Sequence, residues 1–195
     1  MTVTIRALTG SEIMAALDDL ARLRIAVFAE WPYLYDGDFA YERDYLAAFA
    51  AARDAVLVAA CEGDRIVGAA TASPLSAQEA ALSAPVERAG HDPSRLFYFG
   101  ESVLLPAWRG QGIGHAFFDH REAQARRCGA GGAIFASVVR PADHGDQPAD
   151  YRALDAFWDK RGYRPIPGLT CTLSWKDHRE AAESVKPLQY WMRDL

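Results

Sequence analysis

The sequence predicts an α/β protein, a three-layer α/β/α sandwich built around a mixed sheet. Predicted strands and helices alternate along the chain, which favours helices packed on both faces of a sheet. The run 96–105, LFYFGESVLL, is β-rich and apolar enough to be a strand buried on both faces. Two further apolar runs, 55–61 and 65–72, flank the turn Glu62-Gly63-Asp64, which is typical of an antiparallel hairpin.

Composition excludes several classes of partner. The 195 residues favour a single domain over 1–195 with a sizeable core. The net charge is −5, and the longest basic cluster is Arg126-Arg127, so no nucleic-acid partner is expected. No apolar run approaches the ~20 residues that span a bilayer, so no membrane partner is expected. Three separated cysteines without C-x-x-C spacing, and no N-terminal targeting segment, indicate a cytoplasmic protein.

The N-terminal half begins with a strand at 3–8, where apolar and polar residues alternate. Ser11 is placed to cap a helix over 12–30, in which apolar residues recur at helical spacing. The segment Trp31–Gly37 is rich in aromatic residues and broken by proline and glycine. A second helix is predicted over 41–53, with Tyr45 and Phe49 on its buried side, and the hairpin follows it.

The C-terminal half contains the remaining predicted elements. An alanine-rich helix at 76–89 precedes the central strand, which ends at Pro106 because proline cannot donate to a ladder. Then come a helix at 113–128, a buried strand at 133–139 and a loop at 140–149. A helix at 150–161 is predicted from one stripe of Tyr151, Leu154, Phe157 and Trp158, with Gly162 as its C-cap. Strand-like runs at 169–175 and 188–192 end the chain.

Three glycines at every second position, Gly110, Gly112 and Gly114, connect the central strand to the helix that follows it. Glycine lets a ligand approach the backbone without interference from Cβ. The unpaired N–H groups of the first helical turn attract an anion, because the helix dipole is positive at that end. This turn therefore predicts a phosphate or pyrophosphate ligand.

The glycine spacing distinguishes between ligand classes. A dinucleotide fingerprint, G-x-G-x-x-G, fails because its third glycine falls on His115 or Phe117. A P-loop fails because the chain contains no Gly-Lys pair. The motif R-x-x-G-x-G does fit, with Arg109, Gly112 and Gly114, after Pro106 and Trp108. This motif resembles motif A of the GCN5-related N-acetyltransferase (GNAT) superfamily, in which the loop amides hold the pyrophosphate of acetyl-coenzyme A (acetyl-CoA).

The resemblance covers essentially the whole chain, because the order of predicted elements is also the GNAT order. It implies that the strands at 96–105 and 133–139 splay apart and leave a cleft for the pantetheine arm. The backbone contacts for that arm would come from Val103 and Leu105. The remaining coenzyme contacts that the resemblance implies are Arg109, Gly110, Gln111, Gly112, Ile113, Gly114 and His115. The first two helices and their loop would wall the acceptor pocket, with Arg24, Phe28, Tyr33, Tyr35 and Glu42 as substrate contacts.

Glu101 is the candidate general base. A carboxylate in an apolar strand is either paired or functional, and burial raises a carboxylate's pKa toward the range useful for a base. A structural salt bridge is the alternative role for Glu101. The tyrosine that donates a proton in many GNAT enzymes is replaced here by Trp158, whose indole N–H is no acid near neutral pH. Tyr151 is the substitute candidate; otherwise the thiolate leaves unassisted or another residue donates.

The expected function is therefore transfer of an acetyl group from acetyl-CoA to a primary amine of a small molecule or peptide, by direct attack. The alternative is a non-catalytic acyl-CoA-binding sensor of the same fold. A serine hydrolase is disfavoured because the run Gly100–Leu104 lacks the closing glycine of a nucleophile elbow. No metal is expected, since His115 and His120 lie about 140° apart around a helix. A homodimer paired through the C-terminal strands is also an expectation from the resemblance.

Overall fold

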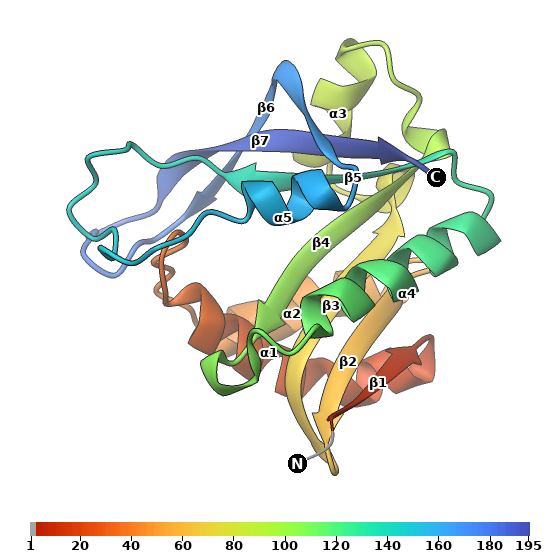
Figure 1. The fold of residues 1–195 in the computed structure, drawn as a ribbon, viewed down its shortest axis with the longest axis horizontal. Coiled ribbons are helices and arrows are strands. Elements are labelled where there is room, and N and C mark those ends of the chain that lie inside the picture. The colour runs from red at the N-terminus through yellow and green to blue at the C-terminus, as the bar shows by residue number, and fades with distance from the viewer. Residues whose placement is uncertain (1–2) are drawn as a thin grey trace.

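The computed structural model describes residues 3–195. Its strands form one mixed sheet in the order β1-β2-β3-β4-β5-β7-β6 (Figure 1). All neighbouring strands are antiparallel except β4 and β5, which are parallel. The strands are β1 (Val3–Leu8), β2 (Val56–Glu62), β3 (Arg65–Pro74), β4 (Leu96–Leu104), β5 (Gly132–Val138), β6 (Arg164–Trp175) and β7 (Ser184–Asp194).

Helices cover both faces of this sheet, which confirms the three-layer α/β/α fold (Figure 1). On one face α4 and α5 share an aromatic core with β4 and β5, where the rings of Phe118 and Phe157 meet at 5.6 Å. On the other face α1 and α2 bury a second core that contains Leu20 and Leu46. The helices are α1 (Ser11–Phe28), α2 (Phe39–Ala51), α3 (Ala80–Arg88), α4 (Ile113–Arg127) and α5 (Asp155–Lys160).

The two central strands separate partway along their length. β4 and β5 pair only over residues 96–98 and 132–134, whereas β7 pairs with β5 along the whole of β5. Beyond Tyr98, therefore, one edge of β4 has no strand beside it. This confirms the partly splayed sheet.

A bulge interrupts β4 at the point where the strands separate. Ala70 of β3 pairs with Ser102, but Ala72 pairs with Phe99, so β4 has one extra residue in this interval. Before the bulge, Phe97 and Phe99 pack on the α4 side. After it, Val103 packs on the α1 and α2 side. The side chains of β4 alternate between the two faces of the sheet, and the bulge shifts this alternation by one residue. Odd-numbered residues therefore face α4 before the bulge and face α1 and α2 after it.

The predicted helix at 150–161 is wrong over its first turn. α5 is only Asp155–Lys160, and Tyr151 and Leu154 are exposed. A helix in a globular protein is stabilised mainly by burying an apolar stripe. Only Phe157 and Trp158 find such a partner here, in the rings of Phe118, Phe135 and Trp191. The segment before Asp155 therefore stays irregular.

Smaller differences occur at other element ends. Gly10, with φ of 53°, holds the N-cap position of α1, so Ser11 is the first helical residue and not a cap. α3 is shorter than the predicted helix, and Leu75–Ala77 forms a separate 3₁₀ turn. Gly162 has the left-handed conformation expected after α5. The single domain over 1–195 and the homodimer stay predictions. Within residues 3–195, no helix has the length and apolarity needed to cross a membrane.

Candidate active site

The turn between β4 and α4 presents a row of free backbone amides. Gly110 and Gly112 adopt φ of 75° and 81°, a left-handed conformation that favours glycine. Gly112 is the N-cap of α4, and its carbonyl accepts from the N–H groups of His115 and Ala116 at 3.0 and 3.2 Å. The N–H groups of residues 110–114 meet no acceptor within the described chain. This turn is therefore suited to bind an anion.

The register between β3 and β4 decides which main-chain groups of β4 face the open edge. The Leu105 N–H donates to the Val67 carbonyl at 3.1 Å, so the main-chain groups of Leu105 and, two residues earlier, Val103 point toward β3. The groups of Ser102 and Leu104 point the other way, to the edge that β5 leaves open. Accordingly, the Leu104 carbonyl accepts from Arg109 Nε at 3.0 Å instead of from a strand. The main-chain groups of Val103 and Leu105 are thus directed at β3, and those of Ser102 and Leu104 are left at the open edge.

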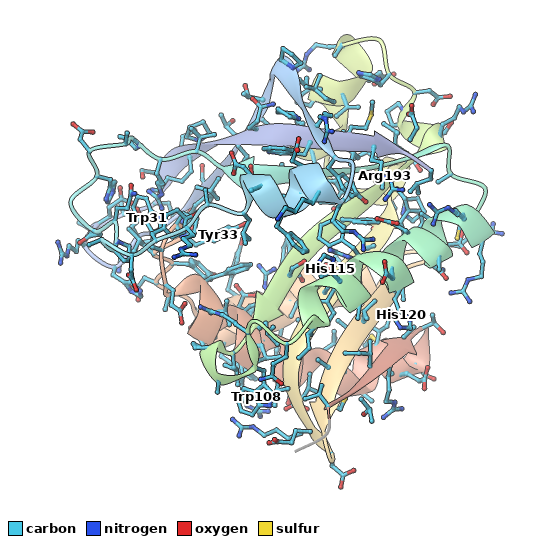
Figure 2. All side chains as sticks on the ribbon, in the orientation of Figure 1. Trp31, Tyr33, Trp108, His115, His120 and Arg193 are labelled. Atoms are coloured by element: carbon cyan, nitrogen blue, oxygen red, sulfur yellow. The ribbon has the colours of Figure 1, made fainter. Side chains whose placement is uncertain are left out.

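The other side chains predicted at the turn lie around it. Arg109 also pairs with Glu30 through Nη2 at 2.9 Å, which connects the end of β4 to the end of α1. Gln111 donates to the Ala107 carbonyl at 3.1 Å. His115 is exposed on the first turn of α4, with its ring 4.9 Å from that of Phe157 (Figure 2). Ile113 is buried in the core beneath the turn, so only its backbone N–H is available to a ligand.

A buried ion cluster joins α1, α2 and β4. Arg24 Nε donates to Glu42, and Arg24 Nη1 lies 2.8 Å from Glu101 Oε2. The side chains of Arg24 and Glu101 are 11% and 8% exposed, and Glu42 is fully buried. Burial alone would lower the pKa of Arg24, but the two carboxylates raise it above its ordinary value. Arg24 is therefore held in its charged form between Glu42 and Glu101.

The predicted substrate contacts gather around this cluster. The Arg24 guanidinium lies 5.0 Å from the centre of the Phe28 ring, which stacks on Tyr33 at 4.2 Å. Burial raises the pKa of Tyr33 to about 12. Burial and the Glu42 carboxylate also raise the pKa of Tyr35. The structure thus brings the five predicted residues together beside Glu101, from α1, α2 and their connecting loop.

A small cavity of about 30 Å³ lies between α2, β3 and β4, with Glu101 in its wall. Sequence reasoning placed two of its aromatic residues, Tyr45 and Phe49, on the buried side of a helix without assigning them to a site. Burial and the Glu101 charge raise the pKa of Tyr45 to about 12. The other lining residues are Thr71, Ala72, Ser73, Gln78, Tyr98 and Gly100.

Arg140, which the sequence reasoning missed, holds the α1–α2 loop in place. Its guanidinium donates to the carbonyls of Pro32 and Tyr33 at 2.7 and 2.6 Å, and to both carboxylate oxygens of Asp177. Trp175 Nε1 donates to the same Tyr33 carbonyl at 3.0 Å. These bonds connect the loop carrying Tyr33 (Figure 2) to β5 and to the β6–β7 connection. No local pattern in the sequence pairs residue 140 with residue 32.

Arg121, also missed, supports the β4 bulge from α4. The bulge disrupts the ladder at Thr71, whose carbonyl accepts from Arg121 Nη1 at 3.4 Å. The guanidinium lies between the rings of Phe99 and Phe118, and burial lowers the pKa of Arg121 to about 10. Thr71 also explains why residue 100 is a glycine, because a Cβ at this position would lie 2.5 Å from Thr71 Oγ1.

Tyr151, the candidate proton donor, and Trp158, which stands in place of the tyrosine common in the GNAT family, lie in different surroundings. Tyr151 is 36% exposed in the irregular segment before α5, and its ring lies 6.0 Å from that of Trp31. Trp158 packs edge-on against Phe135 and Trp191 at 5.0 and 5.1 Å. Trp158 therefore fills the aromatic core between α5 and the sheet. Within residues 3–195, no group of three His, Cys, Asp or Glu side chains is arranged to hold a metal ion.

This fold and this site define a class of protein: a splayed α/β sandwich with an anion-binding turn after its central strand. The model of the acetyltransferase (GNAT) family matches residues 11–149. The chain therefore belongs to the GNAT family, and it is an enzyme of the N-acetyltransferase class. No protein with a curated description matches the chain.

Solved structures with the same fold span nearly the whole chain at low sequence identity. An aminoglycoside 6′-N-acetyltransferase complexed with coenzyme A is 16% identical, with a TM-score of 0.61, and the match covers 98% of this chain and 96% of that one. The Salmonella typhimurium protein yncA, with its cofactor acetyl-CoA, is 13% identical, with a TM-score of 0.58 and coverage of 100% and 95%. A ribosomal-protein-alanine N-acetyltransferase from Brucella melitensis is 16% identical, with a TM-score of 0.59 and coverage of 98% and 99%.

Proposed function

We propose that this enzyme transfers the acetyl group of acetyl-CoA to a primary amine by direct attack. The observation that carries the proposal is the row of free amides at residues 110–114, next to the open edge of β4. The pyrophosphate of coenzyme A can bind the free amides, and its pantetheine arm, which contains amide groups, can bind the open edge of β4. Two of the similar structures hold coenzyme A or acetyl-CoA.

The coenzyme contacts follow from this geometry. The amides of Gly110 to Gly114, with Arg109 and His115 beside them, bind the pyrophosphate. The pantetheine arm lies along β4 and bonds the main-chain groups of Ser102 and Leu104. Because Arg109 Nε bonds the Leu104 carbonyl at 3.0 Å in the protein alone, Arg109 turns away from that carbonyl when the arm binds.

Glu101 prepares the acceptor for attack. The thioester supplies an activated acyl group, but an amine attacks it only after losing a proton. Glu101 lines the cavity beside the splayed edge, and its carboxylate accepts that proton directly or through a water. The new bond joins the amine nitrogen to the acetyl carbon, the carbon–sulfur bond breaks, and the second proton that the nitrogen loses passes to the departing thiolate. Arg24 and Glu42 hold the Glu101 side chain in position.

The departing thiolate takes no proton from α5. Trp158 is no acid near neutral pH, and it is packed between Phe135 and Trp191. We therefore expect Trp158→Phe, which keeps an aromatic ring, to retain kcat within a few-fold. Steady-state release of CoA measures this. A loss of about 10³, in the range of a proton-transfer group, would place Trp158 in the chemistry. Tyr151→Phe, compared in the same assay, reports whether the exposed tyrosine donates instead.

A thermal-shift titration tests the function. Acetyl-CoA at about 100 times its dissociation constant adds about 2.7 kcal/mol to the free energy of unfolding, whereas NAD and ATP are expected to add nothing. The binding experiment is followed by an assay of CoA release with a panel of amines. Release that depends on the amine distinguishes an enzyme from a sensor, which binds the coenzyme without turnover. No stabilisation by acetyl-CoA would contradict the proposed coenzyme.

A further inference from the structure

The cavity between α2, β3 and β4 has the size of an amino head group. Its volume is about 30 Å³, and about 10–15 Å³ of such space holds one water. The cavity therefore has room for roughly two non-hydrogen atoms. It lies beside the bulge, because Gly100 and Glu101 belong to both. Tyr98, the last residue of β4 that pairs with β5, also lines the cavity, so a bound group lies close to the point where these two strands separate.

The charge of the cavity wall fits a cation. Of the residues that line the cavity, Glu101 carries a charge and the others are neutral. Arg24 contacts Glu101 through Oε2, and Oε1 meets no donor among the described residues. Glu101 lines the cavity, so its Oε1 is free to accept a hydrogen bond from a group that binds there. An ammonium group bound in the cavity would donate to this oxygen and pair its positive charge with the carboxylate.

The neutral residues of the cavity add to this fit. The rings of Tyr45, Phe49 and Tyr98 line it, and aromatic faces attract cations. Gln78 Nε2 donates to Ser73 Oγ at 2.6 Å, so these two side chains are already ordered. Because –CH₂–NH₃⁺ already fills a cavity of about 30 Å³, a methyl group beside the amine has no space.

We infer that this cavity binds the ammonium end of an unbranched primary amine, –CH₂–NH₃⁺, and selects such acceptors against α-branched and N-methylated amines. The inference rests on the proposed function, because it takes the cavity as the acceptor site of that reaction. The bound ammonium gives its proton to the Glu101 carboxylate, and the neutral amine that results attacks the acetyl carbon.

Calorimetric titration of the full-length protein with three amines tests the inference. The probes are n-butylamine, sec-butylamine and N-methylbutylamine at pH 7, where all are cations. The linear amine is expected to bind at least about tenfold more tightly than either of the others, since one misplaced methylene costs about 10 to 200-fold. No binding of n-butylamine, or equal affinity for the three, would overturn the inference.

Variants connect the selectivity to the cavity. Phe49→Ala enlarges the cavity and is expected to reduce the difference between linear and branched amines to less than about threefold. The control is Phe39→Ala, which makes the same change on the same helix. Phe39 is partly buried but does not line the cavity, so this variant is expected to keep the difference in affinity between linear and branched amines. Gln78→Ala enlarges the cavity from another element, in case Phe49→Ala fails to fold. Unchanged selectivity in the enlarged variants overturns the inference.

The titrations use the protein without coenzyme, so they are independent of acetyl-CoA binding. If acetyl-CoA stabilises the protein and n-butylamine does not bind, the cavity is not the acceptor site and the coenzyme assignment stands. If n-butylamine binds selectively and acetyl-CoA does not bind, the proposed function fails and the amine site stands. The two failures are therefore distinguishable.

Discussion

Replacing Gly112 with valine is expected to weaken acetyl-CoA binding by about two to three orders of magnitude. Gly112 has φ of 81° and precedes the first residue of α4. A Cβ at this position meets no atom within 4 Å in the protein alone, so the new side chain occupies the space in which the pyrophosphate is proposed to lie. Each charge-assisted hydrogen bond that is lost costs about 1.5–3 kcal/mol. Calorimetric titration with acetyl-CoA measures the change.

Gly129→Val is the matched control. Gly129 lies just beyond the other end of α4, has φ of 75°, and would also place its Cβ in open space. Both variants therefore carry the same backbone strain, about 1–2 kcal/mol, and they are expected to melt at similar temperatures. Only Gly112→Val should lose affinity. Equal affinity in the two variants would remove the pyrophosphate from this turn.

Replacing Glu101 with glutamine is expected to lower kcat by about 10² to 10⁴-fold, the range for a general base. The affinity for acetyl-CoA should stay unchanged, because the Glu101 side chain points to the α1 side and not toward the glycine turn. Glutamine keeps the size of the side chain but cannot accept a proton. Release of CoA at saturating amine, together with a coenzyme titration, measures both quantities.

Glu42→Gln controls for the ion cluster. It makes the same chemical change to the other partner of Arg24, but Glu42 does not line the cavity. Both variants remove one charge from a buried pair, so both should be destabilised. If kcat falls equally in the two folded variants, Glu101 supports the structure and is not the base. A loss confined to Glu101→Gln assigns the proton transfer to it.

The bulge in β4 connects the fold to the chemistry. Without the extra residue, Glu101 would follow Phe97 and Phe99 into the aromatic core under α4. With it, Glu101 meets Arg24 on α1 and faces the cavity. Arg121 bonds the carbonyl that the bulge leaves without a ladder partner, and the charges of Glu101 and Glu122 act on its buried guanidinium. The irregularity therefore places the candidate base.

The sequence by itself determined the features that depend on neighbouring residues. Apolar periodicity predicted the order of elements, and the spacing of Arg109, Gly112 and Gly114 predicted the strand, turn and helix of the family. These signals are local. The glycines of a turn lie within a few residues of one another, and so do the successive apolar residues on one face of a helix. The same local reasoning failed for Tyr151, where a helical spacing had no apolar surface to pack against.

Only the tertiary structure decided which groups face the site. The choice between Leu104 and Leu105 depends on the register with β3, and a shift of one residue reverses every main-chain and side-chain direction. The partners of Arg24 and Arg140 come from segments far away in the chain, through contacts such as Arg140 with Pro32. Such pairs are set by how helices and loops pack on the sheet. That packing depends on the whole core, which no short stretch of sequence encodes.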